Sequence, residues 1–252
     1  MTSLPDWPEG GGRVLLPSVD STNAEAFRQA PHLTGPCWFL AAEQTAGRGR
    51  RARAWSSPRG NFYGTLLLHP TEPPQQVALR SFAAALALRE ALAAATGTTA
   101  GLTLKWPNDV LMNGGKVAGI LLESQGTGQG ISALAIGIGV NLIAHPDPAL
   151  VEAGAVPPVS VLSETGIRLS PEAFLAHLAP AYARWEAAFV AEGFAPLRAE
   201  WLAHAARLGE RIVARTGTQT REGVFETVDA EGNLVLRMGD LTLAIPAAEV
   251  FF

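Results

Sequence analysis

Apolar positions recur along this chain with two different periods, and the period changes near the C-terminal end. Between Pro171 and Gly193, large apolar side chains follow one another three or four positions apart, which is the spacing of one helix face. After Leu208 the apolar residues alternate with polar ones in short runs, which is typical of strands. The pattern therefore predicts a large region of helices and strands, followed by a small region of strands alone.

Glycines, prolines and capping residues set the bounds of the expected elements. Thr22 and Glu25 have the spacing of a capping box, so a helix should begin there. An Ala- and Leu-rich segment that stops at Gly97 predicts a second, longer helix. Four prolines between residues 145 and 158 predict a loop. The expected helices cover residues 22–30, 75–96, 171–192 and about 196–207, and the expected strands cover residues 14–19, 37–42, 61–69, 102–106, 116–123, 131–142, 211–215, 224–228, 234–238 and 241–245.

This order of elements predicts two domains. Residues 1–207 should form an α+β domain, and the short strands of residues 208–252 should form a small barrel appended to it. A length of 252 residues fits one large and one small domain. Apolar residues make up 48% of the chain and charged residues 17%, which is enough apolar material for a packed core.

Charge and cysteine content exclude several classes of function. The chain has 19 basic and 23 acidic residues, a balance that disfavours a protein that coats nucleic acid. Its one cysteine, Cys37, rules out an internal disulfide and a cysteine-clustered zinc site. The longest apolar stretch, 131–144, is too short to span a bilayer, and the N-terminus shows no secretion signal. We therefore expect a cytoplasmic protein that binds neither membranes nor bulk nucleic acid.

Residues 47–53 read Gly-Arg-Gly-Arg-Arg-Ala-Arg, with four arginines in six positions. Because the arginines repel one another, we expect the segment not to order without an anionic partner. Glycines let backbone N–H groups approach a phosphate closely. Three interpretations remain open at this point: a solvated basic loop, a nucleic-acid patch, and a clamp for the phosphate of a small molecule. The acidic net charge counts against the second.

Only two of the basic residues are lysines, Lys105 and Lys116, and they lie close together in the sequence. Lys105 ends an expected strand and is followed directly by a Trp-Pro-Asn-Asp turn. That position suits an ammonium aimed into a pocket, and it equally suits a surface lysine in an ion pair. Asp109, which ends the turn, is interpreted either as a turn residue or as a group that faces a metal-bound phosphate.

Two further segments have the composition of a binding site. Gly137 and Gly139 lie within an expected strand, so they fail as a dinucleotide-binding fingerprint and instead indicate a bulge or a flat group against the backbone. Ser21, Thr22 and Asn23 stand at a helix start, where they cap the helix or bind a polar ligand. The sequence lacks a Gly-x-x-x-x-Gly-Lys loop, a Gly-x-Ser-x-Gly elbow and a His-Glu-x-x-His motif, so covalent catalysis has no candidate.

Taken in order, these segments resemble biotin protein ligase. The resemblance rests on residues 21–23, 43–55, 105–109, 115–123 and 137–141 together with the C-terminal strands. It implies a mixed sheet with flanking helices, related to class II aminoacyl-tRNA synthetases and lipoate ligases, and an SH3-like C-terminal barrel. Only about a dozen residues precede the first expected strand, so we expect a short form without the N-terminal DNA-binding domain of some members, and no repressor role.

The resemblance implies a two-step reaction. Biotin and ATP would give biotinyl-5′-AMP and pyrophosphate, and biotin would then pass to one lysine of a biotin carboxyl carrier protein, the acetyl-CoA carboxylase subunit. Mg²⁺ would accompany ATP, and a homodimer is compatible with the resemblance. Two alternatives stay open: an activity like that of lipoate–protein ligase, and a non-enzymatic adaptor that binds anions through residues 48–53.

The resemblance also assigns residues to roles. It implies that Lys105 and Arg50 are the catalytic residues, and it implies no particular metal ligand. Ala52 stands where the family usually has glycine, which leaves the effect on loop ordering open. The implied biotin-binding residues are Ser21, Thr22, Asn23, Gln44, Gly47, Arg48, Gly49, Arg50, Lys105, Gly119, Gly137 and Gly139. The implied nucleotide-binding residues are Arg50, Arg51, Arg53, Trp55, Lys105 and Asn141.

Overall fold

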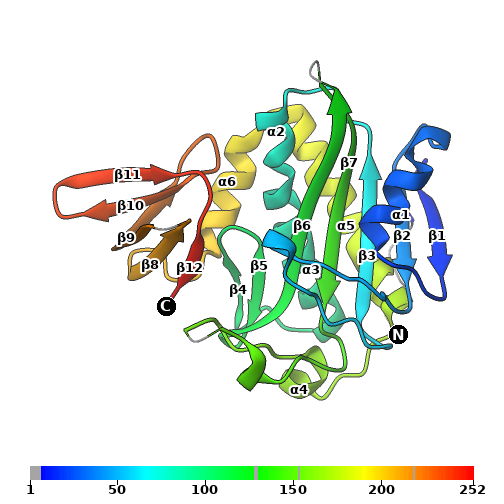
Figure 1. Cartoon of the computed structure of the whole chain (residues 1–252), viewed down its shortest axis with the longest axis horizontal. Coiled ribbons are helices and arrows are strands. Elements are labelled where there is room, and N and C mark those ends of the chain that lie inside the picture. The colour runs from blue at the N-terminus through cyan, green and yellow to red at the C-terminus, as the bar shows by residue number, and fades with distance from the viewer. Residues whose placement is uncertain (1–6, 128–129, 153, 218) are drawn as a thin grey trace.

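A computed structural model describes residues 7–127, 130–152, 154–217 and 219–252, which form two sheets with helices beside the larger one (Figure 1). The larger sheet has the strand order β1-β2-β3-β7-β6-β5-β4. β1 and β2 are parallel and the other neighbours are antiparallel, so the predicted mixed sheet is confirmed. Its strands are β1 (Gly12–Leu16), β2 (Cys37–Ala41), β3 (Phe62–Leu68), β4 (Leu102–Lys105), β5 (Asp109–Met112), β6 (Gly115–Thr127) and β7 (Gly130–Val140).

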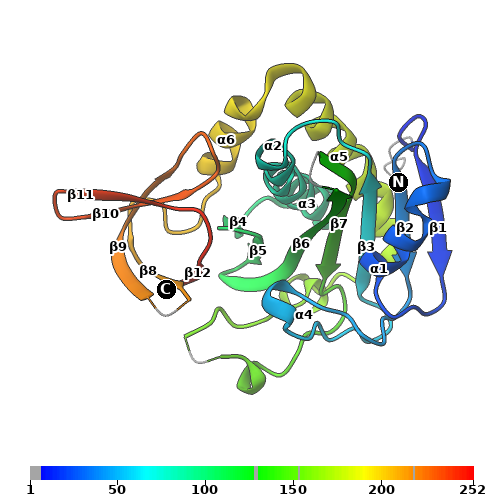
Figure 2. The ribbon, with the colours of Figure 1, turned by 45° about the horizontal axis from the view of Figure 1, so that its top comes forward.

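Helices cover both faces of this sheet (Figures 1 and 2). They are α1 (Thr22–Gln29), α2 (Pro74–Ala78), α3 (Arg80–Thr96), α4 (Val161–Thr165), α5 (Pro171–Glu192) and α6 (Phe194–Ala203). Alternation along β2 explains the two layers: Trp38 and Leu40 face the main core with α3 and α5, whereas Phe39 faces the smaller core with α1. No helix among the described residues has the length and apolar character needed to cross a membrane.

Two predictions about helices were wrong. The expected helix 75–96 is divided at Leu79, where the Leu79 N–H bonds to Gln76 O and the Phe82 N–H bonds to Leu79 O with three-residue spacing. The expected capping box is absent as well. Ser21 is the N-cap of α1, while the Thr22 hydroxyl donates to Gln44 Oε1 across the site.

The C-terminal strands form an antiparallel sheet in the order β11-β10-β9-β8-β12, with β11 and β12 at its edges (Figure 2). These strands are β8 (Arg211–Thr216), β9 (Gln219–Val228), β10 (Leu234–Met238), β11 (Leu241–Ile245) and β12 (Glu249–Phe251). The sequence did not predict β5, β12 or α4, which are three to five residues long. The division of the chain at residues 207 and 208 stays a prediction.

One apolar core runs from the larger sheet into the C-terminal sheet. The ring of Trp201 packs edge-on against Phe82 at 5.4 Å between centroids and against Phe225 at 6.5 Å. The indole N–H of Trp106 donates to Gly232 O at 3.1 Å. These contacts fix the C-terminal sheet beside β4 and bring β12 to the face of the larger sheet that carries α1.

Candidate active site

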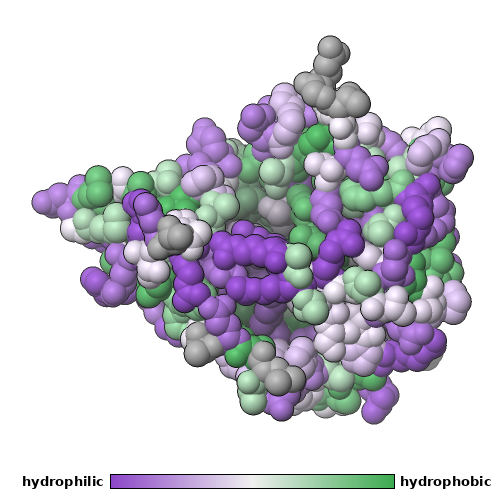
Figure 3. Space-filling view, viewed as in Figure 1, coloured by the Kyte–Doolittle hydropathy of each residue, from purple (hydrophilic) through white to green (hydrophobic). Residues whose placement is uncertain are grey.

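A cavity of about 580 Å³ lies on the sheet face that carries α1, and its walls come from both sheets. Hydrophilic residues gather in the middle of this face, between the two sheets (Figure 3). Most of the residues that the resemblance assigns meet there. Those that line the cavity are Ser21, Thr22, Asn23, Gln44, Arg48, Gly49, Arg50, Arg53, Trp55, Lys105, Gly119, Gly137, Gly139 and Asn141.

The two other assigned residues, Gly47 and Arg51, lie beside the cavity without lining it. A Cβ atom on Gly47 would stand 2.7 Å from Ser57 Oγ and 2.9 Å from Gln44 Nε2, so only glycine fits this position. The Arg51 guanidinium pairs with Glu249 at 2.8 Å. Gly47 therefore supports the wall around Gln44, and Arg51 anchors the loop to β12.

One wall of the cavity is a chain of neutral polar side chains. Gln44 Oε1 accepts from the Thr22 N–H at 2.9 Å and from the Thr22 hydroxyl at 3.1 Å. Gln44 Nε2 donates to Ser57 Oγ at 3.2 Å. On the other side, the Thr65 hydroxyl lies 2.8 Å from Thr22 Oγ1 and 2.6 Å from Asn23 Oδ1. These bonds fix the donor and acceptor positions that the wall presents, because each buried group has a set partner.

The arginines of the basic loop, residues 47–55, pair with acidic residues of the same chain. The expectation that the loop needs an anionic partner to order stays a prediction. Arg53 pairs with Glu249 at 2.6 Å and with Glu152 at 3.1 Å, and Arg51 pairs with Glu249. Glu249 belongs to β12 and Glu152 to the loop 145–158. These carboxylates neutralise the repulsion between the arginines, and the sequence pattern could not reveal them because they lie about a hundred or more positions away.

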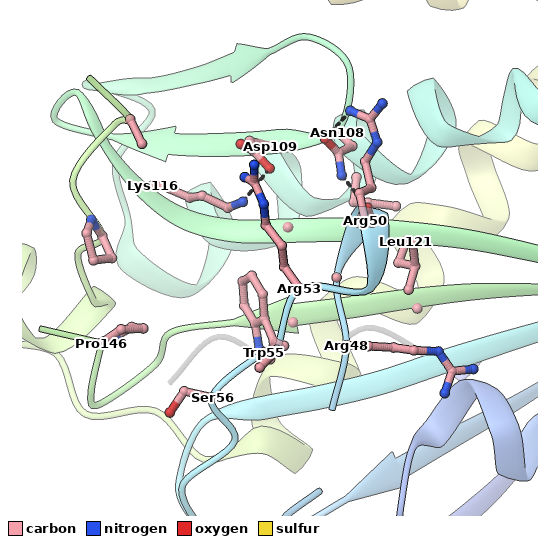
Figure 4. Close-up of a pocket in the computed structure, with 18 of the residues that line it drawn as sticks. Arg48, Arg50, Arg53, Trp55, Ser56, Asn108, Asp109, Lys116, Leu121 and Pro146 are labelled. Carbon is pink, nitrogen blue, oxygen red and sulfur yellow. Dashed lines mark hydrogen bonds and ion pairs between the residues drawn. The ribbon is translucent and has the colours of Figure 1, made fainter. Parts of the chain in front are cut away.

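Arg50 is the least exposed arginine of this loop, and it lines the cavity next to Asn108 (Figure 4). Its Nη1 lies 3.4 Å from Asn108 Oδ1 and 3.4 Å from Ala248 O. Burial lowers the pKa of the Arg50 guanidinium, and the charge of Asp109 opposes that shift. After Arg50 the backbone is left-handed at Arg51 (φ 55°) and at Ala52 (φ 57°), a conformation that costs a non-glycine residue about 1–2 kcal/mol.

Two lysines and an aspartate meet at the ends of three neighbouring strands. β5 places Asp109 opposite Lys105 of β4 and opposite Gly119 of β6. Asp109 Oδ1 lies 2.7 Å from Lys116 Nζ, and the two form an ion pair whose angles are not those of a hydrogen bond. Asp109 Oδ2 lies 3.8 Å from Lys105 Nζ. Figure 4 shows Lys116 pointing toward Asp109. The carboxylate therefore stands between two ammonium groups, one of which is buried.

Lys105 is the buried member of this pair, with 9% of the residue exposed. Burial lowers the pKa of its ammonium, the charge of Asp109 opposes that shift, and the charges of Lys116 and Arg50 add to it. An anion bound next to Lys105 would raise its pKa again, because opposite charge favours the protonated form. The site thus holds a poorly solvated cation suited to bind an anionic group.

Trp55 lies flat on the floor of the cavity, over two of the predicted glycines. A Cβ atom on Gly139 would stand 2.5 Å from Trp55 Cε2, and one on Gly119 would stand 3.2 Å from Trp55 Cζ3. A Cβ atom on Gly137 would stand 2.4 Å from Asn23 Oδ1. The glycines therefore make room for side chains of the chain itself, and their contact with a ligand stays a prediction.

Replacing Gly139 with alanine is expected to lower the free energy of unfolding by about 1–3 kcal/mol, because the added methyl group overpacks the floor against the rigid indole of Trp55. Chemical denaturation measures this loss. Gly130→Ala on the same strand is the control, since its Cβ would meet nothing within 4 Å. Equal stability of the two variants would contradict the packing of Trp55 on Gly139.

Residues 15–141 match the biotin/lipoate A/B protein ligase family, and residues 208–252 match the biotin protein ligase C-terminal domain. The chain belongs to the biotin/lipoate A/B protein ligase family. The first match contains every residue that the resemblance assigned to the site, and the second contains Glu249, which pairs with the basic loop.

Individual relatives agree with this membership. A biotin–[acetyl-CoA-carboxylase] ligase of Paracoccus denitrificans is 59% identical over 238 residues, which are 94% of this chain and 99% of the relative. The bifunctional ligase/repressor BirA of Bacillus subtilis is 31% identical over 94% of this chain and 71% of its own length. The structure of a biotin protein ligase from Aquifex aeolicus in complex with biotin and ATP matches with a TM-score of 0.80 at 25% identity, over 95% of this chain and 97% of that one.

Sequence reasoning missed the parts of the cavity that are distant in the chain. Thr65 and Ser57 do not line the cavity but hydrogen-bond to Asn23 and Gln44, which do, and both look like ordinary strand or loop residues in the sequence. Glu249 and its neighbours in β12 line the cavity from the other sheet. Lys116 and Asp109 could have been predicted as site residues from the sequence. Lys116 is the second lysine of a lysine-poor chain, and Asp109 ends the Trp-Pro-Asn-Asp turn.

Proposed function

We propose that this chain activates biotin with ATP to biotinyl-5′-AMP and transfers the biotinyl group to a lysine of a biotin carboxyl carrier protein. One observation carries the proposal: a single cavity combines a wall of neutral polar side chains, the buried ammonium of Lys105 and the arginines of the basic loop. A ligase for these substrates needs the same combination, because it must hold a neutral ring, a carboxylate and a phosphate chain together.

The first step joins two anions and therefore needs fixed positive charge. A biotin carboxylate oxygen attacks the α-phosphorus of ATP, the bond to the bridging oxygen breaks, and pyrophosphate leaves. Positioning and electrostatic stabilisation supply most of the catalysis in such transfers. Lys105 is suited to bridge the carboxylate and the α-phosphate, because its ammonium has few competing solvent contacts. Arg50 is suited to bind the phosphate from the loop side.

The polar wall suits the biotin head group. The ureido ring offers one carbonyl acceptor and two N–H donors, and each needs a partner in a buried pocket because an unpaired polar atom there costs about 1–3 kcal/mol. Ser21, Thr22, Asn23 and Gln44 provide both hydroxyl and amide groups, all within the cavity. We assign this wall to the ring and the Trp55 side of the cavity, with Asn141, to the nucleotide.

The second step needs no nucleophile from this chain. The neutral amine of the carrier lysine attacks the acyl carbonyl of biotinyl-5′-AMP and an amide bond forms. AMP leaves with the electrons of the broken acyl–phosphate bond, and the amine releases one proton to water. The lack of a covalent-catalysis motif fits this course, since the nucleophile belongs to the partner. Lys105 would then stabilise the charge on the departing AMP phosphate.

Mg²⁺ enters the proposal as the cation that ATP carries on its phosphates. The described residues contain no group of three His, Cys, Asp or Glu side chains arranged for a metal, and Asp109 is already paired with Lys116. Phosphate oxygens and water would therefore supply most ligands, as they commonly do for this ion. A homodimer and a cytoplasmic location also stay predictions, which sedimentation and fractionation would test.

Titration calorimetry tests the proposed substrate. We expect biotin to bind with micromolar or tighter affinity and biotin-dependent pyrophosphate release to follow when ATP is added. Binding of lipoate with no binding of biotin would support the lipoate-ligase alternative and contradict the proposal. A protein that binds neither small molecule would instead support the anion-binding adaptor.

A further inference from the structure

Glu123 lies at the rim of the cavity, where parts of the site from distant segments meet. Along β6, Gly119, Leu121 and Glu123 occupy alternate positions, so they project from the same face of the sheet. Gly119 and Leu121 line the cavity, and Glu123 lies beyond them with 29% of its side chain exposed. The resemblance assigns no role to this carboxylate.

The first contact of Glu123 orients the polar wall. Glu123 Oε2 accepts a hydrogen bond from Asn23 Nδ2 at 2.8 Å. An ionised carboxylate only accepts hydrogen bonds, so Asn23 must present its amino group to Glu123. The Asn23 carbonyl then faces Thr65, whose hydroxyl lies 2.6 Å away as the donor. Glu123, together with the Leu121 carbonyl oxygen 3.4 Å from the same Nδ2, thus orients the Asn23 amide.

The other wall residues are fixed separately from Glu123. Thr65 has one hydroxyl proton for its two neighbours, Asn23 Oδ1 and Thr22 Oγ1, so it donates to only one of them. The N–H and the hydroxyl of Thr22 both donate to Gln44 Oε1, which leaves Gln44 Nε2 directed at Ser57. The direct effect of Glu123 on the wall is therefore the orientation of Asn23.

The second contact of Glu123 holds the basic loop. Arg48 approaches the carboxylate through two nitrogens, Nε at 3.3 Å from Oε1 and Nη2 at 3.2 Å from Oε2. Arg48 is the first arginine of the loop and lies 75 positions before Glu123. Figure 4 shows its side chain extending away from Asp109 and Lys116, toward the opposite end of the cavity.

We propose that Glu123 is a positioning residue that holds the basic loop closed against the polar wall, so that the two are ordered together around the bound ring. Its effect on biotin rests on the proposed function, whereas its effect on the loop does not. Neither contact of Glu123 involves Lys105 or Arg50. The chemical step should therefore be insensitive to it, while binding and retention should depend on it.

Glu123→Gln tests the effect on the substrate. The amide cannot form the ion pair with Arg48, and it can offer Asn23 a donor in place of an acceptor. We expect the KM for biotin to rise about tenfold and preformed biotinyl-5′-AMP to escape about tenfold faster, with kcat for pyrophosphate release within about twofold of the parent. An unchanged KM, or a loss confined to kcat, would overturn the proposal.

Glu43→Gln is the matched control. Glu43 pairs with Arg59 at 3.1 Å next to the same loop, but its pair includes neither Arg48 nor Asn23. We expect this variant to keep the parent's KM and escape rate, since exposed ion pairs contribute little by themselves. A rise in KM as large as that of Glu123→Gln would show a general effect of charge loss and overturn the proposal.

Limited trypsin digestion separates this proposal from the proposed function, because it needs no substrate. With Glu123→Gln we expect cleavage after the arginines of residues 48–53 to be about threefold faster than with Glu43→Gln, at equal Tm. Equal cleavage rates would overturn the closing role of Glu123 even in an active enzyme. An absence of biotin-dependent pyrophosphate release by the parent would overturn the proposed function and leave the cleavage result valid.

Discussion

Lys105→Ala is expected to reduce biotin-dependent pyrophosphate release by about a thousandfold, the upper range for the loss of one preorganised electrostatic group. The reason is the position of the ammonium: it is buried in the cavity, and burial lowers its pKa, so the pocket gains most from an anion placed next to it. Single-turnover measurement of pyrophosphate measures the step directly. A rate within tenfold of the parent would remove Lys105 from the mechanism.

The fold of this variant should survive, which keeps the result interpretable. Because the pKa of Lys105 is lower in the folded protein than in the unfolded chain, folding disfavours the charged form at neutral pH, and alanine removes that cost. Asp109 keeps its closer partner, Lys116, at 2.7 Å. We therefore expect Tm to stay the same or rise, and a large drop in Tm would indicate that the activity loss has a structural cause.

The elements predicted correctly from the sequence are those that carry their own signal. The helix from Pro171 to Glu192 has a long apolar face, a Ser-Pro start and a glycine end, and each feature is local. β5 has four residues and forms by pairing with β4 and β6, so its apolar residues could not be told from a continuing turn in the sequence. β12 has three residues and forms because β8 is beside it.

The site shows the same division between local and distant information. Ordered motifs such as residues 21–23 and 105–109 identify segments that meet in the cavity, because each motif lies at the end of an element. Their partners do not follow from the motifs. The counter-charges of the basic loop, Glu123, Glu152 and Glu249, are set by tertiary packing, and the chain has 23 acidic residues from which they would have to be chosen.

Arg80→Leu is expected to lower the free energy of unfolding by about 3–5 kcal/mol, the usual cost of removing one partner from a buried ion pair. Arg80 is 3% exposed and pairs with Glu72 at 2.8 Å and with Glu186 at 2.7 Å. Burial alone would lower the pKa of Arg80, but the hydrogen bonds that its guanidinium donates to Glu186 and Glu72 more than offset burial and raise that pKa. Leucine would leave both carboxylates without their cation, and chemical denaturation would measure the loss.

Arg184→Leu distinguishes burial from the mere loss of an ion pair. Arg184 pairs with Glu90 on the surface, and more than half of its side chain is exposed, so its removal should cost at most about 1 kcal/mol. Adding Glu186→Gln to Arg80→Leu should restore part of the stability, because glutamine removes the uncompensated charge. Its side-chain oxygen can still accept the hydrogen bond that the Tyr182 hydroxyl donates to Glu186 at 2.9 Å. If Arg80→Leu lowered the free energy of unfolding no more than Arg184→Leu does, the buried ion pairs of Arg80 with Glu72 and Glu186 would not contribute to the packing of α3 against α5.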